Sequence, residues 1–89
     1  MLQKKTWLLV TFYTTAGVMA MERACKAASL PGRIVPVPRS ITADCGLAWR
    51  CEPTLRSSVE ALADPEEVMG IYMLFIRRYK EATKLTTKV

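Results

Sequence analysis

The sequence predicts an α+β fold: a ferredoxin-like β-α-β-β-α-β two-layer sandwich with a four-stranded antiparallel sheet. Four short segments rich in β-branched and aromatic residues alternate with two segments whose apolar residues recur at helical spacing. Prolines and glycines stand at the junctions between these segments. The chain has 89 residues, of which 51% are hydrophobic, so it suits one domain with one core. This order of elements packs two helices on one face of a sheet.

The first half of the chain is predicted to contain two strands and a helix. Residues 6–13 form a strand because aromatic and β-branched side chains dominate them. Thr14 or Thr15 caps a helix that runs to about residue 28, since a threonine hydroxyl accepts from the free N–H groups of a first turn. Residues 31–32 end the helix, and residues 33–37 form the second strand. The buried stripe of the helix is expected to hold Val18, Met21, Cys25 and Ala28.

The second half begins with a strand over residues 46–52. Its odd-numbered side chains, Leu47, Trp49 and Cys51, face one side of the sheet, and the intervening Ala48, Arg50 and Glu52 face the other. A helix with Thr54 as a plausible cap follows from Pro53 to about Ala63, and its buried face is Leu55, Val59 and Leu62. Residues 71–76 form the last strand, after Gly70.

The distribution of charge suggests a domain and a tail. We expect residues 1–80 to form a single domain and residues 81–89 a basic C-terminal tail. Much of the net charge of +5 gathers near this end, where Glu81 alone opposes Arg77, Arg78, Lys80, Lys84 and Lys88. Such a run is typical of a solvated helical tail, and docking on an acidic protein or RNA is the alternative.

The cysteine count and the N-terminal segment indicate the compartment. Three cysteines are an odd number, which a secreted disulfide scaffold rarely has. The apolar run after Lys5 is interrupted by threonines and is too short for a membrane span, so we expect no membrane association. A cytoplasmic protein with free thiols is the resulting prediction.

Several site chemistries are disfavoured. The chain has no histidine, and three scattered cysteines cannot supply the closely spaced ligand pairs of a structural zinc site, so we predict no metal. The four glycines are isolated, which argues against a phosphate-binding loop, and we predict no cofactor. Aromatic strands with a basic tail can mimic an RNA-binding sheet, but the RNP-type consensus is absent, which disfavours a nucleic-acid partner.

The segment from Val35 to Leu47 is the strongest candidate site. Pro36 and Pro38 exclude a helix, and Gly46 permits a positive φ directly after Cys45. A cysteine on such a constrained turn is displayed rather than buried. Without a histidine base, its thiol has to act as a carrier, a redox centre or a ligand.

Opposing charges surround that thiol in the sequence. Arg39 and Arg50 are cations that favour a thiolate, and the amides of Gly46 and Leu47 could donate to the sulfur. Asp44 acts in the opposite direction unless its carboxylate turns away.

Of the other two cysteines, Cys51 has two interpretations and Cys25 has one. Cys51 is a core residue or a resolving thiol that forms a disulfide with Cys45, which requires Cα atoms within about 7 Å. Six residues of straight strand span about 20 Å, so the loop would have to fold back. Cys25 lies on the helix stripe and is expected to pack as a small hydrophobe.

Four motifs follow one another along the chain: Phe12-Tyr13-Thr14-Thr15, Ala20-Met21-Glu22, Pro36-Val37-Pro38-Arg39 and Cys45-Gly46-Leu47-Ala48. Together they resemble a known family, the small bacterial proteins described as selenium/sulfur carrier-like, over roughly residues 7–76. It implies a persulfide or perselenide carrier whose motif cysteine is Cys45. The acid Asp44 departs from the small residue expected there.

We therefore predict a protein that takes up a persulfide or perselenide on Cys45 and relays it between a donor and an acceptor protein. Whether this relay amounts to enzyme activity stays open. The alternative is a non-catalytic interaction module that forms homo-oligomers through the open face or edges of its sheet.

Overall fold

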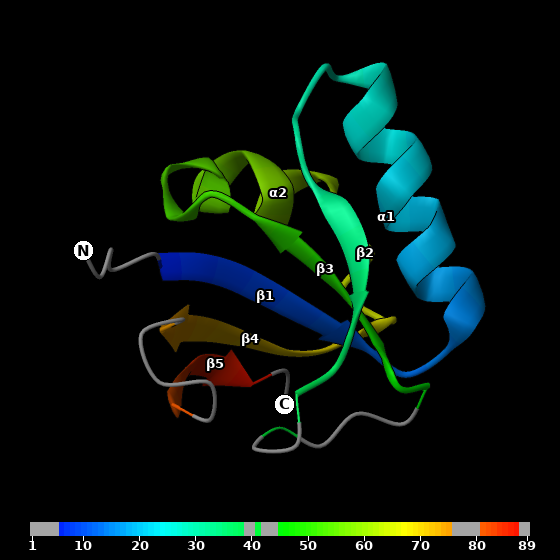
Figure 1. Ribbon diagram of the computed structural model, residues 1–89. Helices are drawn as coiled ribbons and strands as arrows, with labels where there is room; N and C mark the ends of the chain where they lie inside the picture. Colours follow the sequence, from blue (N-terminus) through cyan, green and yellow to red (C-terminus); the bar gives the residue numbers. More distant parts are fainter. Residues whose placement is uncertain (1–5, 39–40, 42–44, 76–80, 88–89) are drawn as a thin grey trace.

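The computed structural model describes residues 6–38, 41, 45–75 and 81–87 (Figure 1). It contains five strands, two α-helices and a short 3-10 helix, in the order β1 (Thr6–Phe12), α1 (Thr15–Ala27), β2 (Arg33–Pro36), β3 (Leu47–Cys51), η1 (Pro53–Leu55), α2 (Arg56–Leu62), β4 (Val68–Phe75) and β5 (Glu81–Thr87). None of the helices in these ranges is long and apolar enough to cross a membrane.

The strands form one antiparallel sheet in the order β2-β3-β1-β4-β5. The two strands of each β-α-β unit are separated by one other strand. In the unit β1-α1-β2 the intervening strand is β3, and in the unit β3-α2-β4 it is β1. The two helices lie on one side of the sheet (Figure 1). The predicted α+β class, with two helices packed on an antiparallel sheet, is thus confirmed.

The C-terminal segment differs from the expectation. Residues 81–87 do not form a helical tail; they form β5, which pairs with β4 from Gly70↔Thr87 to Phe75↔Glu81. The sheet therefore has a fifth strand in addition to the four that were predicted. Three threonines in this strand have the β-branched shape that favours a pleated sheet.

Helix boundaries agree in the first half and differ in the second. The first helix lies where it was predicted, with Val18, Met21 and Cys25 buried, but the prediction that Ala28 is buried is wrong, because it is the exposed C-cap residue. The second predicted helix is divided into η1 and α2, with Val59 buried and no cap contributed by a side chain. The prediction that Leu62 is buried is wrong: α2 ends at this residue, and Leu62 is 39% exposed.

The larger core lies between the helices and the sheet. Its largest member is Trp49, which is 1% exposed. A Cβ at Gly32 would meet the Trp49 indole and lie 2.8 Å from the Arg50 carbonyl oxygen, so the chain can pass over this ring only with a glycine. The buried members of this core are Leu8, Val10, Phe12, Val18, Met21, Cys25, Trp49, Cys51, Val59, Val68 and Ile71.

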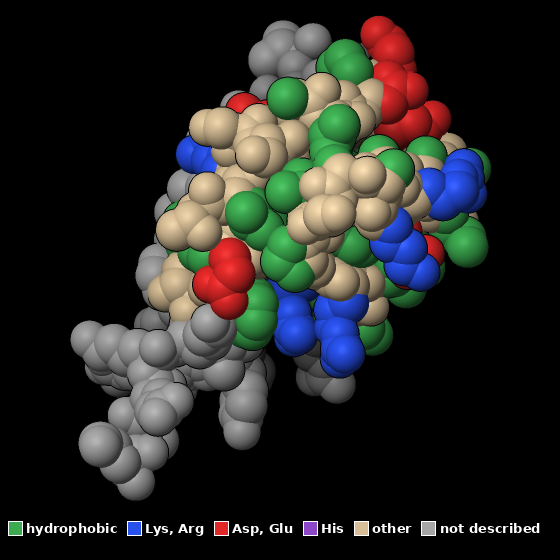
Figure 2. Space-filling view, turned by 90° about the horizontal axis from the view of Figure 1, so that it is seen from above, with side chains coloured by type: hydrophobic (Ala, Val, Ile, Leu, Met, Phe, Trp, Pro, Cys, Tyr) green, Lys and Arg blue, Asp and Glu red, His purple; other side chains and the backbone are tan. Residues whose placement is uncertain are grey.

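The other face of the sheet is not an open surface at its centre. Leu9 and Ala48 are fully buried there, and they form a second cluster with Leu74 and with Ile41, which belongs to the segment between β2 and β3. Residues on both faces of β1 are therefore desolvated, and its last five residues are all buried. This outer-face cluster contradicts the expectation of an uncovered sheet face. On the side of the molecule where α1 and α2 lie, which Figure 2 shows from above, hydrophobic side chains are interspersed with charged and other polar ones.

Hydrogen bonds through one threonine fix the start of α1. Thr14 has extended backbone and its hydroxyl oxygen accepts from the Gly17 N–H at 3.0 Å, which makes it the N-cap. The same hydroxyl donates to a Glu67 carboxylate oxygen at 2.6 Å, and the Tyr13 N–H donates to the Glu67 carbonyl at 2.9 Å. Glu67 thereby joins the turn before β4 to the first turn of α1.

We predict that Thr14→Ala lowers the free energy of unfolding by about 1–2 kcal/mol, because it removes the cap and the bond to Glu67 together. Thr14→Ser keeps both functions of the hydroxyl and is expected to lower the free energy of unfolding by only a few tenths of a kcal/mol. The neighbouring Thr15 is exposed and lies inside the helix, so Thr15→Ala is the matched control. Urea unfolding measures all three, and equal losses for Thr14→Ala and Thr15→Ala would contradict the assignment of the cap.

Candidate functional site

Cys45 lies at the end of the sheet where α1 begins. The β1–β3 ladder ends with the pair Thr11↔Ala48, and the two strands run antiparallel. The residues that follow Thr11 and those that precede Ala48 therefore emerge at the same end of the sheet (Figure 1). Cys45 packs against the edge of the helix-side core, as does Leu47.

Backbone hydrogen bonds hold the segment that carries this cysteine. The Val37 N–H donates to the Gly46 carbonyl at 3.0 Å and extends the β2–β3 pairing beyond Leu47. The Ile41 N–H donates to the Pro38 carbonyl at 3.0 Å. Gly46 has φ +77°, which confirms the predicted left-handed residue after the thiol.

The thiol of Cys45 is the donor in its own hydrogen bond. Its Sγ lies 3.5 Å from the Leu47 carbonyl oxygen, which accepts from the S–H. The sequence suggests backbone amides as donors to the sulfur, and the structure places a carbonyl there instead. A thiolate has no proton to donate, so this hydrogen bond is lost when the thiol ionises.

The three cysteines all lie in the described part of the chain, are free, and differ in exposure. Cys45 is half-buried, whereas Cys25 and Cys51 are 0% and 1% exposed. Burial raises the pKa of Cys25, and burial with the neighbouring Cys25 and Glu52 raises the pKa of Cys51 to about 12. Thiols of this kind are inert at neutral pH. Cys45 is therefore the thiol that reagents and partners can reach.

Cys51 is a core residue and does not approach Cys45. Both face the helices, but Cys51 ends β3 and the ladder continues in the opposite direction through Gly46. From Leu47 to Cys51 alone, β3 spans about 13 Å of extended chain, which exceeds the Cα separation of a disulfide, and the pairing continues away from Cys51. The neighbour of the Cys51 sulfur is Cys25, so the hypothesis of a resolving thiol is corrected.

Arg50 lies on the opposite face of the sheet from Cys45. Its guanidinium carbon stacks 4.2 Å from the centre of the Trp7 ring, which belongs to the outer-face cluster. The prediction that Arg50 stabilises the Cys45 sulfur is therefore corrected by the alternation of side chains along β3. Arg39 and Asp44 lie outside the described residues.

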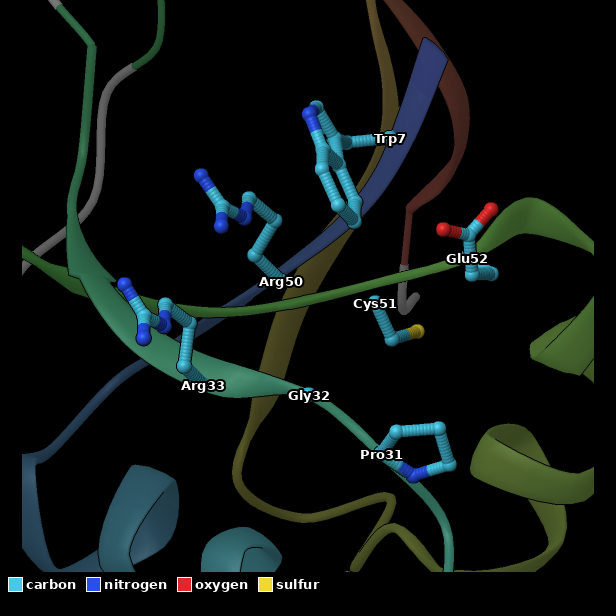
Figure 3. A pocket seen from close by; sticks show the side chains of 7 residues that line it. All are labelled: Trp7, Pro31, Gly32, Arg33, Arg50, Cys51 and Glu52. Carbon is cyan, nitrogen blue, oxygen red and sulfur yellow. The ribbon is translucent and has the colours of Figure 1, made fainter. Parts of the chain in front are cut away.

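A pocket of about 450 Å³, which no sequence motif predicts, lies around Arg50 instead (Figure 3). Trp7, Arg33, Arg50 and Glu52 contribute to its lining. Trp7 and Arg50 become neighbours only through the β1–β3 pairing, in which Leu9 is opposite Arg50. The alternating pattern of the two strands was the one available signal. No group of three metal-ligating side chains occurs within the described ranges.

Comparison with protein families identifies the family of this chain. The family described as "Putative Se/S carrier protein-like" matches residues 8–72, which include most of β1, all of α1, β2, β3 and α2, and the Cys45 segment. No curated protein and no solved structure matches the chain. Because the match spans most of the chain, this protein belongs to the Se/S carrier protein-like family.

Proposed function

We propose that this protein carries sulfur or selenium as a persulfide or perselenide on Cys45. The observation that supports it most is the contrast among the three cysteines: Cys25 and Cys51 are sealed in the core, whereas Cys45 is half-buried on a constrained turn. Family membership supports the same cargo. The transfer requires a donor and an acceptor protein and a compartment that keeps thiols reduced, for which the cytoplasm is our proposal.

The transfer needs no external oxidant or reductant. The Cys45 thiolate attacks the terminal sulfur of a donor persulfide, R–S–SH. A new S–S bond forms at Cys45, the bond between the two donor sulfurs breaks, and the donor leaves as a thiol after taking up a proton. With selenium, the atom transferred is the terminal selenium of R–S–SeH. The acceptor thiol repeats the same exchange on the chalcogen held by Cys45.

Two features of the site suit this exchange. Rotation of the sulfur away from the Leu47 carbonyl exposes it, and Gly46 has no Cβ and nothing within 4 Å of where one would stand, which leaves room for a partner's backbone.

Intact mass spectrometry tests the proposal. After incubation with a cysteine desulfurase and cysteine, we expect the protein to gain about one sulfur mass, and we expect a reducing agent to remove it. Cys45→Ser is expected to gain none. Cys51→Ser and Cys25→Ser are the matched controls, and both should still gain the sulfur provided that they fold.

Circular dichroism of each variant separates loss of the fold from loss of the acceptor thiol. An adduct on folded Cys45→Ser, or no adduct on the wild-type protein, would overturn the proposal.

A further inference from the structure

The pocket on the outer side of β3 has the residues of an anion-binding site that is separate from Cys45. Arg33 on β2 and Arg50 on β3 are direct partners in the strand ladder. Directly opposite residues of an antiparallel pair point to the same face, with Cβ atoms about 4.5–5.5 Å apart. Two guanidinium groups therefore stand next to each other beside the pocket (Figure 3).

Like charges in directly opposite positions destabilise a sheet unless something compensates them. Neither arginine has a carboxylate partner within the described ranges, whereas Arg56 on α2 has Glu60. The Nε of Arg50 is, moreover, buried without a hydrogen-bond partner there. A partly desolvated guanidinium of this kind gains more from a bound anion than a fully hydrated one does.

Trp7 fixes the position of one of the two cations. Arg50 stacks on the Trp7 ring at 4.2 Å, which restricts the rotamers of its long side chain. In Figure 3 the Arg33 and Arg50 guanidinium groups lie on one side of the Trp7 ring, and the Glu52 carboxylate lies on the other. Negative charge is therefore favoured at the arginine end of the pocket and disfavoured at the Glu52 end.

The volume of the pocket indicates how large the ligand is. About 450 Å³ falls within the usual range for small-molecule sites and exceeds what one phosphate needs. Trp7 and Pro31 supply apolar walls next to the charged groups. We propose that this pocket binds a small phosphate monoester, with the phosphate on Arg33 and Arg50 and the organic group against Trp7 and Pro31.

The side-chain N–H resonances of the arginines test this directly in the folded protein. We expect the Nε signals of Arg50 and Arg33 to shift saturably when phenyl phosphate is added at constant ionic strength. The Arg56 signal serves as the internal control and is expected to stay in place, because its Nε already donates to Glu60. Inorganic phosphate is expected to bind the same arginines more weakly, since it lacks the ring.

Arg33→Gln is the decisive variant, because Arg33 is exposed and its replacement does not threaten the fold. Loss of its charged hydrogen bonds is expected to weaken phenyl phosphate binding at least about tenfold. Arg56→Gln is the matched control and is expected to bind as the wild type does. Equal, unsaturable shifts of all three arginines, or unchanged affinity in Arg33→Gln, would overturn the site. Equal affinity for phenyl phosphate and inorganic phosphate would overturn the assignment to a monoester.

Discussion

In the folded protein, iodoacetamide is expected to alkylate Cys45 at least about a hundredfold faster than Cys25 or Cys51 at pH 8. Cys45 is half-buried, while the other two thiols are 0% and 1% exposed. Because the pKa of Cys51 is raised to about 12, only a small fraction of this thiol is the reactive thiolate at pH 8. Timed quenching followed by peptide mass spectrometry measures the three rates separately.

The pH dependence of Cys51 labelling follows from the same shift. With its pKa raised to about 12, the Cys51 thiol stays neutral up to a higher pH than an ordinary cysteine does. At pH 10 only about 1% of it is ionised. In the unfolded chain the same thiol ionises near its ordinary value of 9.0, so the stability gained from burying neutral Cys51 is lost between about pH 9 and 12. Labelling in urea is the control, where all three rates should converge. Native rates within a few fold of one another would contradict the structure around these thiols.

Trp49→Ala is expected to lower the free energy of unfolding by about 3–5 kcal/mol, which is a large share of the stability of a small domain. Trp49 is the largest of the fully buried side chains, and its loss leaves a cavity beneath Gly32 and between β3 and the helices. Urea unfolding followed by circular dichroism measures the loss without depending on tryptophan fluorescence.

Trp49→Phe separates the loss of packing from the loss of the indole nitrogen. The Trp49 Nε1 is buried and has no partner within the described residues, so phenylalanine removes a donor that is costly to bury. We expect this variant to lose less than half of what Trp49→Ala loses. Tyr13→Ala is the aromatic control, because Tyr13 is 41% exposed and its replacement should cost less than about 1 kcal/mol. An equal loss for Trp49→Phe and Trp49→Ala would indicate that the indole nitrogen has a partner.

Those parts of the fold that depend on residues close together in the sequence could be predicted from the sequence. The alternation of Leu47, Trp49 and Cys51 with Ala48 and Arg50 was enough to assign the two faces of β3, and the structure confirms the assignment. The threonine at the start of α1 and the apolar stripe through Cys25 were predictable for the same reason, since caps and stripes depend on residues within a few positions of one another.

Features that depend on contacts between distant segments were missed. The C-terminal strand has lysine and glutamate among its threonines and forms because β4 offers an edge to pair with. Arg50 was assigned to the thiol because it is near Cys45 in sequence, yet its partner is Trp7, which only the strand register brings close. Arg33 was missed for the same reason, since its partner in the ladder lies 17 positions further along the chain.

Ile41 anchors the segment between β2 and β3 in the outer-face cluster, and this packing restricts changes in the length of the segment. Surface loops usually tolerate insertions, because little depends on their path. This one is tied at its base by the bond from Val37 to Gly46, and Ile41 is buried in the outer-face cluster. An inserted residue would have to be accommodated without lifting Ile41 from the sheet or moving Gly46 from Val37. Ile41 and Cys45 are therefore both held by packing on the sheet, Ile41 in the outer-face cluster and Cys45 against the helix-side core.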